Sequence, residues 1–127
     1  MKLWLDDVRP APEGYVWCKS VNEAKSVIES SEDEACNCYA NAVRELNHCH
    51  QTGFFEWVNT GSELLCELID ADHDLGDYAC DGGDGVKLLD WLEETSRNYS
   101  IHIHSQNPVG VQNMRRIIER NGWKEVL

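Results

Sequence analysis

The chain has 127 residues, 42% of them hydrophobic, which fits one domain built around a single core. Its formal net charge of −12 argues against general binding of nucleic acid through the phosphate backbone, and no window is long and apolar enough to span a bilayer. The N-terminal stretch "MKLWLDDVRP" is too acidic for a signal peptide, so we expect a cytoplasmic protein.

The first elements expected are two short strands and a helix. "KLWL" at 2–5 and "YVWC" at 15–18 are apolar and aromatic runs typical of buried strands, and a loop with two prolines separates them. Ser20 followed by Glu23 has the spacing of a capping box, which predicts a helix that begins near Val21.

Residues 31–64 depart from this pattern and are interpreted as an insertion. "SSEDE" at 30–34 is expected to end the first helix, and the apolar spacing of "ACNCYANAVRELNHC" at 35–49 predicts a second one. We therefore predict a helical insertion over about 31–64 that packs beside the sheet, within a single domain over 1–127.

The rest of the chain alternates strands and helices. The pattern predicts a central strand at 64–71, a helix at 86–95, a strand at 100–105, a helix from Pro108 with Asn107 as its N-cap, and a short strand at 123–126. Such alternation predicts an α/β fold with a doubly wound parallel sheet between two layers of helices and the strand order 2-1-3-4-5.

Polar side chains follow three of these strands, where ligands bind in parallel α/β sheets. Since the carboxyl ends of parallel strands share one edge of the sheet, which we call the rim, we expect these groups to form a pocket. The groups are Asp6, Asp7 and Arg9 after the first strand, Asp72, His73 and Asp74 after the third, and His104, Ser105 and Asn107 after the fourth.

The stretches "LDDVRPAP", "DADHDLGD" and "HIHSQNPVG" resemble cyclic-phosphate processing receiver domains, and the resemblance covers nearly the whole chain outside 31–64. It implies a receiver-like, flavodoxin-like fold and action on cyclic phosphates. Asp6 and Asp7 fall where receivers keep metal-binding acids, Asp72 where they keep the phosphoacceptor, and Ser105 at their hydroxyl position. The usual lysine of strand 5 and the final receiver helix are missing, which argues against phosphorelay signalling.

Opening a cyclic phosphodiester requires a base that activates water and an acid that protonates the leaving oxygen, and histidines do both near neutral pH. We therefore expect a phosphoesterase-like reaction on the cyclic phosphodiester of a nucleotide or an RNA end, with His73 and His104 as the acid–base pair and Asp72 as a third catalytic group. His102, two residues earlier on the same strand face, is the alternative to His104. Substrate phosphate would be held by Arg9, Ser105 and the amides after Asn107.

Mg²⁺ or another divalent cation on Asp6, Asp7 and Asp72 would offset the negative charge of this pocket; otherwise no cofactor is expected. The expected partner is a small phosphorylated or cyclic-phosphate substrate, with neither membrane nor bulk nucleic acid, and the exposed last strand offers a route to oligomers. Two alternatives stay open: a non-catalytic module that binds a phosphorylated ligand, and a phosphatase with Asp72 as covalent nucleophile. A calcium loop at 70–81 is disfavoured because Leu75 stands where glycine belongs.

Overall fold

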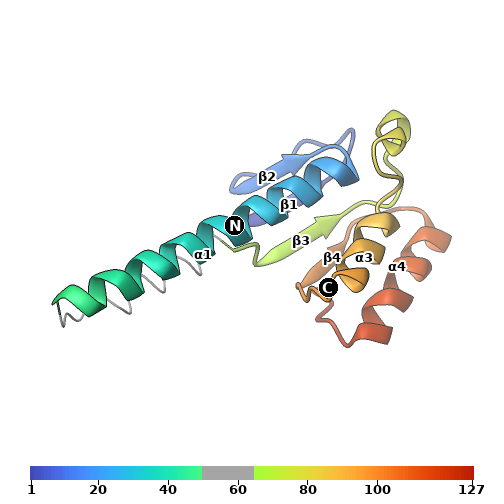
Figure 1. The fold of residues 1–127 in the computed structure, drawn as a ribbon. Helices are drawn as coiled ribbons and strands as arrows, with labels where there is room; N and C mark the ends of the chain where they lie inside the picture. Colours follow the sequence, from blue (N-terminus) through green and yellow to red (C-terminus); the bar gives the residue numbers. More distant parts are fainter. Residues whose placement is uncertain (50–64) are drawn as a thin grey trace.

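The structure is a computed structural model that describes residues 1–49 and 65–127, with side chains described for 1–37 and 65–127. Four parallel strands form one sheet in the order β2-β1-β3-β4 (Figure 1). The strands are β1 (Lys2–Leu5), β2 (Tyr15–Cys18), β3 (Leu68–Ala71) and β4 (Ile101–Ile103). The helices are α1 (Val21–Cys49), the 3-10 helix η1 (Gly76–Cys80), α3 (Val86–Glu94) and α4 (Pro108–Asn121). The predicted α/β class and the order 2-1-3-4 are confirmed.

The three α-helices lie next to one another over one face of the sheet (Figure 1). The crossovers β2–α1–β3 and β3–α3–β4 step across the sheet in the same direction, and right-handed crossovers of that kind place their helices on the same face. Alternate strand residues that point toward these helices are fully buried in one core. Examples are Leu3, Leu5, Ile69, Ala71 and Ile101.

A second helical layer, predicted for a doubly wound sheet, is not seen in the described residues. The step from β1 to β2 runs in the opposite direction and would place its helix on the other face, but its connection, residues 6–14, is a loop. On that face Trp4, Trp17 and His102 are only half-buried, and Asp70, which pairs in register with Trp4 and His102, is buried. The site therefore borders an aromatic sheet face that no described helix covers.

The expected break in the first helix at 30–34 was wrong, because α1 runs without interruption from Val21 to Cys49. The capping box at its start is confirmed: the Glu23 N–H donates to Ser20 Oγ at 3.1 Å. Two polar residues of 30–34 make hydrogen bonds within the fold, and the other three, Ser30, Asp33 and Glu34, are exposed on the helix surface. Ser31 donates to the Ile28 carbonyl, and Glu32 accepts from Arg97 Nε at 2.8 Å. The second part of the predicted insertion, residues 50–64, lies outside the described residues.

The predicted fifth strand at 123–126 is not formed as a strand. Those residues make one parallel bridge beside β4, between Ile101 and Glu125, supported by backbone hydrogen bonds from Ile101 N–H to Lys124 O and from Val126 N–H to Ile101 O. The helix before them ends at Gly122, whose φ of 67° turns the chain sharply into this position. β3 and β4 are also shorter than the predicted ranges 64–71 and 100–105.

The predicted start of α4 is confirmed. Asn107 is its N-cap, with the side-chain oxygen accepting the Gly110 N–H at 3.0 Å, and Pro108 occupies the first helical position. This cap places the amino end of α4 on the same side of the sheet as the carboxyl ends of β1, β3 and β4. None of the described helices combines the length and apolar character that a membrane span requires.

Candidate functional site

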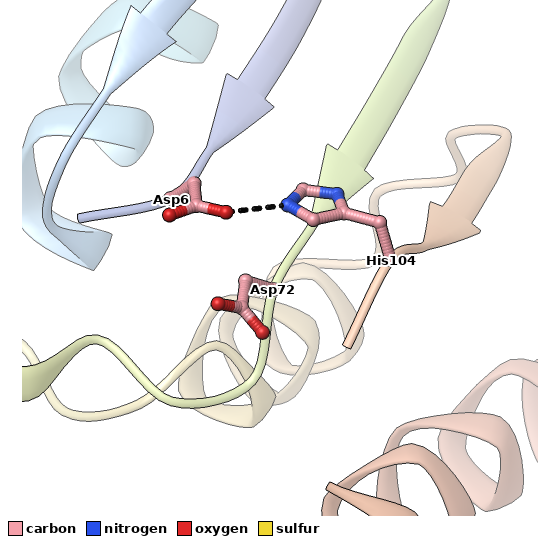
Figure 2. Close-up of side chains that lie close together, drawn as sticks. All are labelled: Asp6, Asp72 and His104. Atoms are coloured by element: carbon pink, nitrogen blue, oxygen red, sulfur yellow. Dashed lines mark hydrogen bonds and ion pairs between the residues drawn. The ribbon is translucent and has the colours of Figure 1, made fainter. Parts of the chain in front are cut away.

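Asp6, Asp72 and His104 meet at the rim (Figure 2). Each is the first residue after a strand: Asp6 follows β1, Asp72 follows β3, and His104 follows β4. Each offers one ligand atom, and these three atoms lie within 4.8 Å of one another. The parallel sheet thus brings together groups that are up to 98 positions apart in sequence.

The His104 ring is fixed on three sides. Its Nδ1 lies 2.6 Å from Asp70 Oδ1, and its Nε2 lies 3.0 Å from Asp6 Oδ2. The ring also stacks on Trp4, with centroids 3.9 Å apart and planes inclined by 6°. The side chains of His104 and Asp70 are each only 9% exposed, so these contacts are made largely out of water. Such an imidazole has one orientation, with Nε2 aimed at the carboxylates of the rim.

The three titratable groups of the site differ in charge preference. Burial disfavours the charged form of His104, but hydrogen bonds with the carboxylates of Asp70 and Asp6 outweigh it and raise the imidazole pKa. Burial also works against the Asp6 carboxylate, yet hydrogen bonds from the two backbone N–H groups that follow it lower its pKa. Burial raises the pKa of Asp72 in spite of a hydrogen bond from Ser105. Asp6 therefore holds its negative charge while Asp72 accepts a proton more readily.

Two predicted substrate-binding residues lie beside this group. The Arg9 side chain is exposed, and its Nη1 reaches 3.5 Å from the His104 carbonyl oxygen, so the guanidinium lies at the rim. The Ser105 hydroxyl faces Asp72 and accepts the Asn107 N–H at 3.2 Å. The Arg9 guanidinium and the Ser105 hydroxyl thus lie beside the Asp6–Asp72–His104 group, where both can donate hydrogen bonds to phosphate oxygens.

His73 lies in a second cluster. Its Nδ1 is 2.8 Å from Asp74 Oδ1, and Asp84 offers the third ligand atom of that cluster. The ring packs against α4 so closely that a Cβ at Gly110 would lie 2.3 Å from its Cγ. Asn107 joins the cluster through its amide, which donates to Asp74. The two predicted histidines are therefore held in different clusters, and only His104 touches the group with Asp6 and Asp72.

Asp7 is separated from the Asp6–Asp72–His104 group in another way. Its Oδ2 lies over the turn that begins η1, where a Cβ on Gly76 would come within 2.6 Å of it.

Gly85 packs against the backbone of Asp72, since a Cβ at Gly85 would lie 1.9 Å from the Asp72 carbonyl oxygen. The loop after β3 can hold Asp72 in place only with glycine at that position.

Sequence reasoning missed Asp70 and Trp4 as parts of the site. A signal was available, because side chains of a strand alternate between faces: Trp4 shares a face with Asp6, and Asp70 shares one with Asp72. In the observed register Trp4 lies opposite Asp70, and Asp70 lies opposite His102. His102 Nδ1 donates to the Val126 carbonyl oxygen at 2.7 Å, and His102 Nε2 lies 4.0 Å from Asp70 Oδ1.

These features define a receiver-like α/β domain with an acidic, histidine-containing site at the carboxyl ends of its strands. The model of the family described as cyclic-phosphate processing receiver domain matches residues 1–120, and the chain belongs to that family. No curated protein and no solved structure gives a significant match to the chain.

Proposed function

We propose that this chain hydrolyses a cyclic phosphodiester at the rim, with Asp72 and His104 as the reacting acid–base pair. The observation that carries the proposal is the convergence of Asp6, Asp72 and His104 within 4.8 Å, with Asp70 fixing the far nitrogen of the imidazole. The family to which the chain belongs supports the substrate class. The geometry favours Asp72 over His73 as the partner of His104, because His73 lies in the other cluster.

The two groups suit opposite steps of the reaction. Asp72 takes a proton from the attacking water, and the raised pKa makes it a better base than an ordinary aspartate. The water oxygen forms a bond to phosphorus, and one ring P–O bond breaks. His104, held as an imidazolium between two carboxylates, gives its Nε2 proton to the departing oxygen. The products are a phosphomonoester and a free hydroxyl group.

Phosphate binding falls to the groups that border this pair. Arg9 can hold two phosphate oxygens with parallel hydrogen bonds, and its exposed side chain is free to turn toward them. Ser105 borders Asp72, and its hydroxyl and the Val109 N–H at the start of α4 can donate to a third oxygen. The remaining negative charge of Asp6 is offset by the His104 imidazolium.

A divalent metal is the alternative to this acid–base route, because a cation bound at His104 Nε2 would displace the proton that the route transfers. Two carboxylates and an imidazole, the latter with its other nitrogen on Asp70, fit a cation that accepts nitrogen, such as Mn²⁺ or Zn²⁺, better than Mg²⁺, which prefers oxygen ligands. Asp6, Asp72 and His104 would hold it, in place of the expected set with Asp7. Such a cation would neutralise the carboxylates and polarise a phosphate oxygen.

The test is turnover of 2′,3′-cyclic nucleotides by wild type, Asp72→Asn and His104→Gln, in chelator and with added Mn²⁺ or Mg²⁺. Each substitution should lower turnover by about 10²–10⁴-fold, the usual contribution of a general acid or base. His102→Gln is the matched control: it lies two residues earlier on the same strand face, and its Nδ1 contacts the Val126 carbonyl. His73→Gln should cost less than His104→Gln.

A non-catalytic receiver-like module is the second candidate function. It is favoured by one observation: both ring nitrogens of His104 already have carboxylate partners, so the imidazolium could serve only to balance charge. In that case wild type would bind phosphorylated ligands at the rim without turnover, and His104→Gln would lower stability. A covalent route through Asp72 would give turnover that survives His104→Gln and disappears in Asp72→Asn.

A further inference from the structure

An aromatic pair with a lysine lies beside the carboxylates of the site and is not used by the proposed chemistry. Lys19 follows β2, and its Nζ lies 4.7 Å from the centroid of the Trp17 ring and 5.9 Å from that of Tyr78. Tyr78 is a large apolar side chain that is 42% exposed, and Trp17 is half-buried. We call Trp17 and Tyr78 the aromatic pair; the ammonium of Lys19 lies against both of its rings.

The aromatic pair is fixed directly to the site. Trp17 Nε1 donates to the backbone carbonyl oxygen of Asp6 at 2.7 Å, which ties the indole to the main chain of a site residue. Tyr78 lies in η1, in the loop that leaves β3 through Asp72. That loop is tied to the start of α1, where Ser20 Oγ donates to Asp81 at 2.7 Å. The rings are therefore held by the same loops that hold Asp6 and Asp72.

We infer that the aromatic pair binds the base of a nucleotide, so that the substrate is a nucleoside cyclic phosphate or a cyclic-phosphate end of RNA, not a cyclic phosphate without a base. The inference rests on the proposed function for the place of the phosphate. A base stacks on Trp17 and Tyr78 in place of the Lys19 ammonium, which lies over both rings when no ligand is bound. The flexible stem of Lys19 then carries its charge toward the ligand's oxygens.

Charge selects a nucleotide over other ligands that bind aromatic rings. An organic cation also favours aromatic faces, but it would be repelled by Lys19 and would bring no group for Arg9. A nucleotide has a neutral base with two π-faces and an anionic phosphate, which matches two rings beside cationic side chains. The formal net charge of −12 favours a single nucleotide or the end of an RNA as the ligand over a long nucleic acid held along its backbone.

The experiment compares two five-membered cyclic phosphates, uridine 2′,3′-cyclic phosphate and glycerol 1,2-cyclic phosphate, which lacks a base. Binding is measured by calorimetry in the Asp72→Asn background so that turnover does not interfere. Base stacking of ordinary strength predicts that the nucleotide binds about 5- to 150-fold more tightly than the glycerol compound. Tyr78→Ala should remove that preference and leave binding of the glycerol compound unchanged.

Tyr15→Ala is the matched control. Tyr15 also lies under a lysine, with Lys2 Nζ 5.6 Å from its ring, but at the start of β2, away from the rim. It should leave the nucleotide preference intact. Equal binding of both probes, no binding of either, or a Tyr78→Ala protein that weakens both alike would overturn the inference. Base-dependent binding by a wild type that turns over neither probe would uphold it and remove the proposed chemistry instead.

Discussion

Replacing Asp70 by asparagine removes the carboxylate that faces His104 Nδ1 while keeping the size of the side chain. The contact is 2.6 Å long, and both side chains are 9% exposed, so its loss is expected near the upper range for hydrogen bonds to charged groups, about 1.5–3 kcal/mol of unfolding free energy. For a domain of this size that lowers the melting temperature by roughly 6–12 °C. The same change leaves Asp6 as the carboxylate that is hydrogen-bonded to the His104 ring in the described part of the chain.

The effect of Asp70→Asn depends on pH in a fixed direction. The folded-state pKa of His104 is raised above its ordinary value of 6.5, so the stability that His104 contributes is fully present below about pH 6.5 and is lost as the pH rises through the folded pKa. Asp70→Asn should therefore destabilise more at pH 5.5 than at pH 8.5. Urea unfolding in chelator at both pH values measures this, with His102→Gln as control. An equal loss at the two pH values would refute the reasoning.

Further expectations concern the loop below the site, the anchor of α1 and the metal. Gly85→Ala should cost about 3 kcal/mol or more and lower turnover, because its Cβ would press on the Asp72 carbonyl oxygen; thermal unfolding and turnover check this. The hydrogen bond from Arg97 lowers the pKa of Glu32, so the stability that this pair contributes is present above about pH 4.5 and is lost as the pH falls. In Arg97→Ala, the free energy of unfolding in urea should therefore change less between pH 5 and pH 3 than it does in wild type. Mn²⁺ at 100 times its Kd should stabilise wild type by about 2.7 kcal/mol in calorimetric melts, and Asp6→Asn should lose that gain.

Elements with local signals could be predicted from the sequence. The cap of α4 depends on Asn107 and Pro108, which are adjacent, and the start of α1 depends on Ser20 and Glu23. The continuation of α1 through 30–34 could not be predicted in the same way. One residue of this stretch, Glu32, is held by a partner far along the chain, since Arg97 is 65 positions away. Local propensity at such a position is overridden by tertiary contacts.

The sequence predicted which residues lie at the rim, but it did not predict which of them contact one another. Strand alternation alone puts His73 on the opposite side from Asp72, which agrees with its place against Gly110. The contact between Asp70 and His104 depends on the register of β3 with β4, which no single strand contains. The uncovered sheet face follows from the loop at 6–14, which has no helical periodicity.

The most direct test of the central claim is ³¹P NMR of a nucleoside 2′,3′-cyclic phosphate incubated with wild type, Asp72→Asn, His104→Gln and His102→Gln. The account predicts that wild type and His102→Gln convert the cyclic phosphate signal into that of a phosphomonoester. Asp72→Asn and His104→Gln, checked for folding, should do so about 10²–10⁴-fold more slowly. A wild type that binds the nucleotide at the rim but leaves the cyclic signal unchanged, or a His104→Gln protein as fast as wild type, would contradict it.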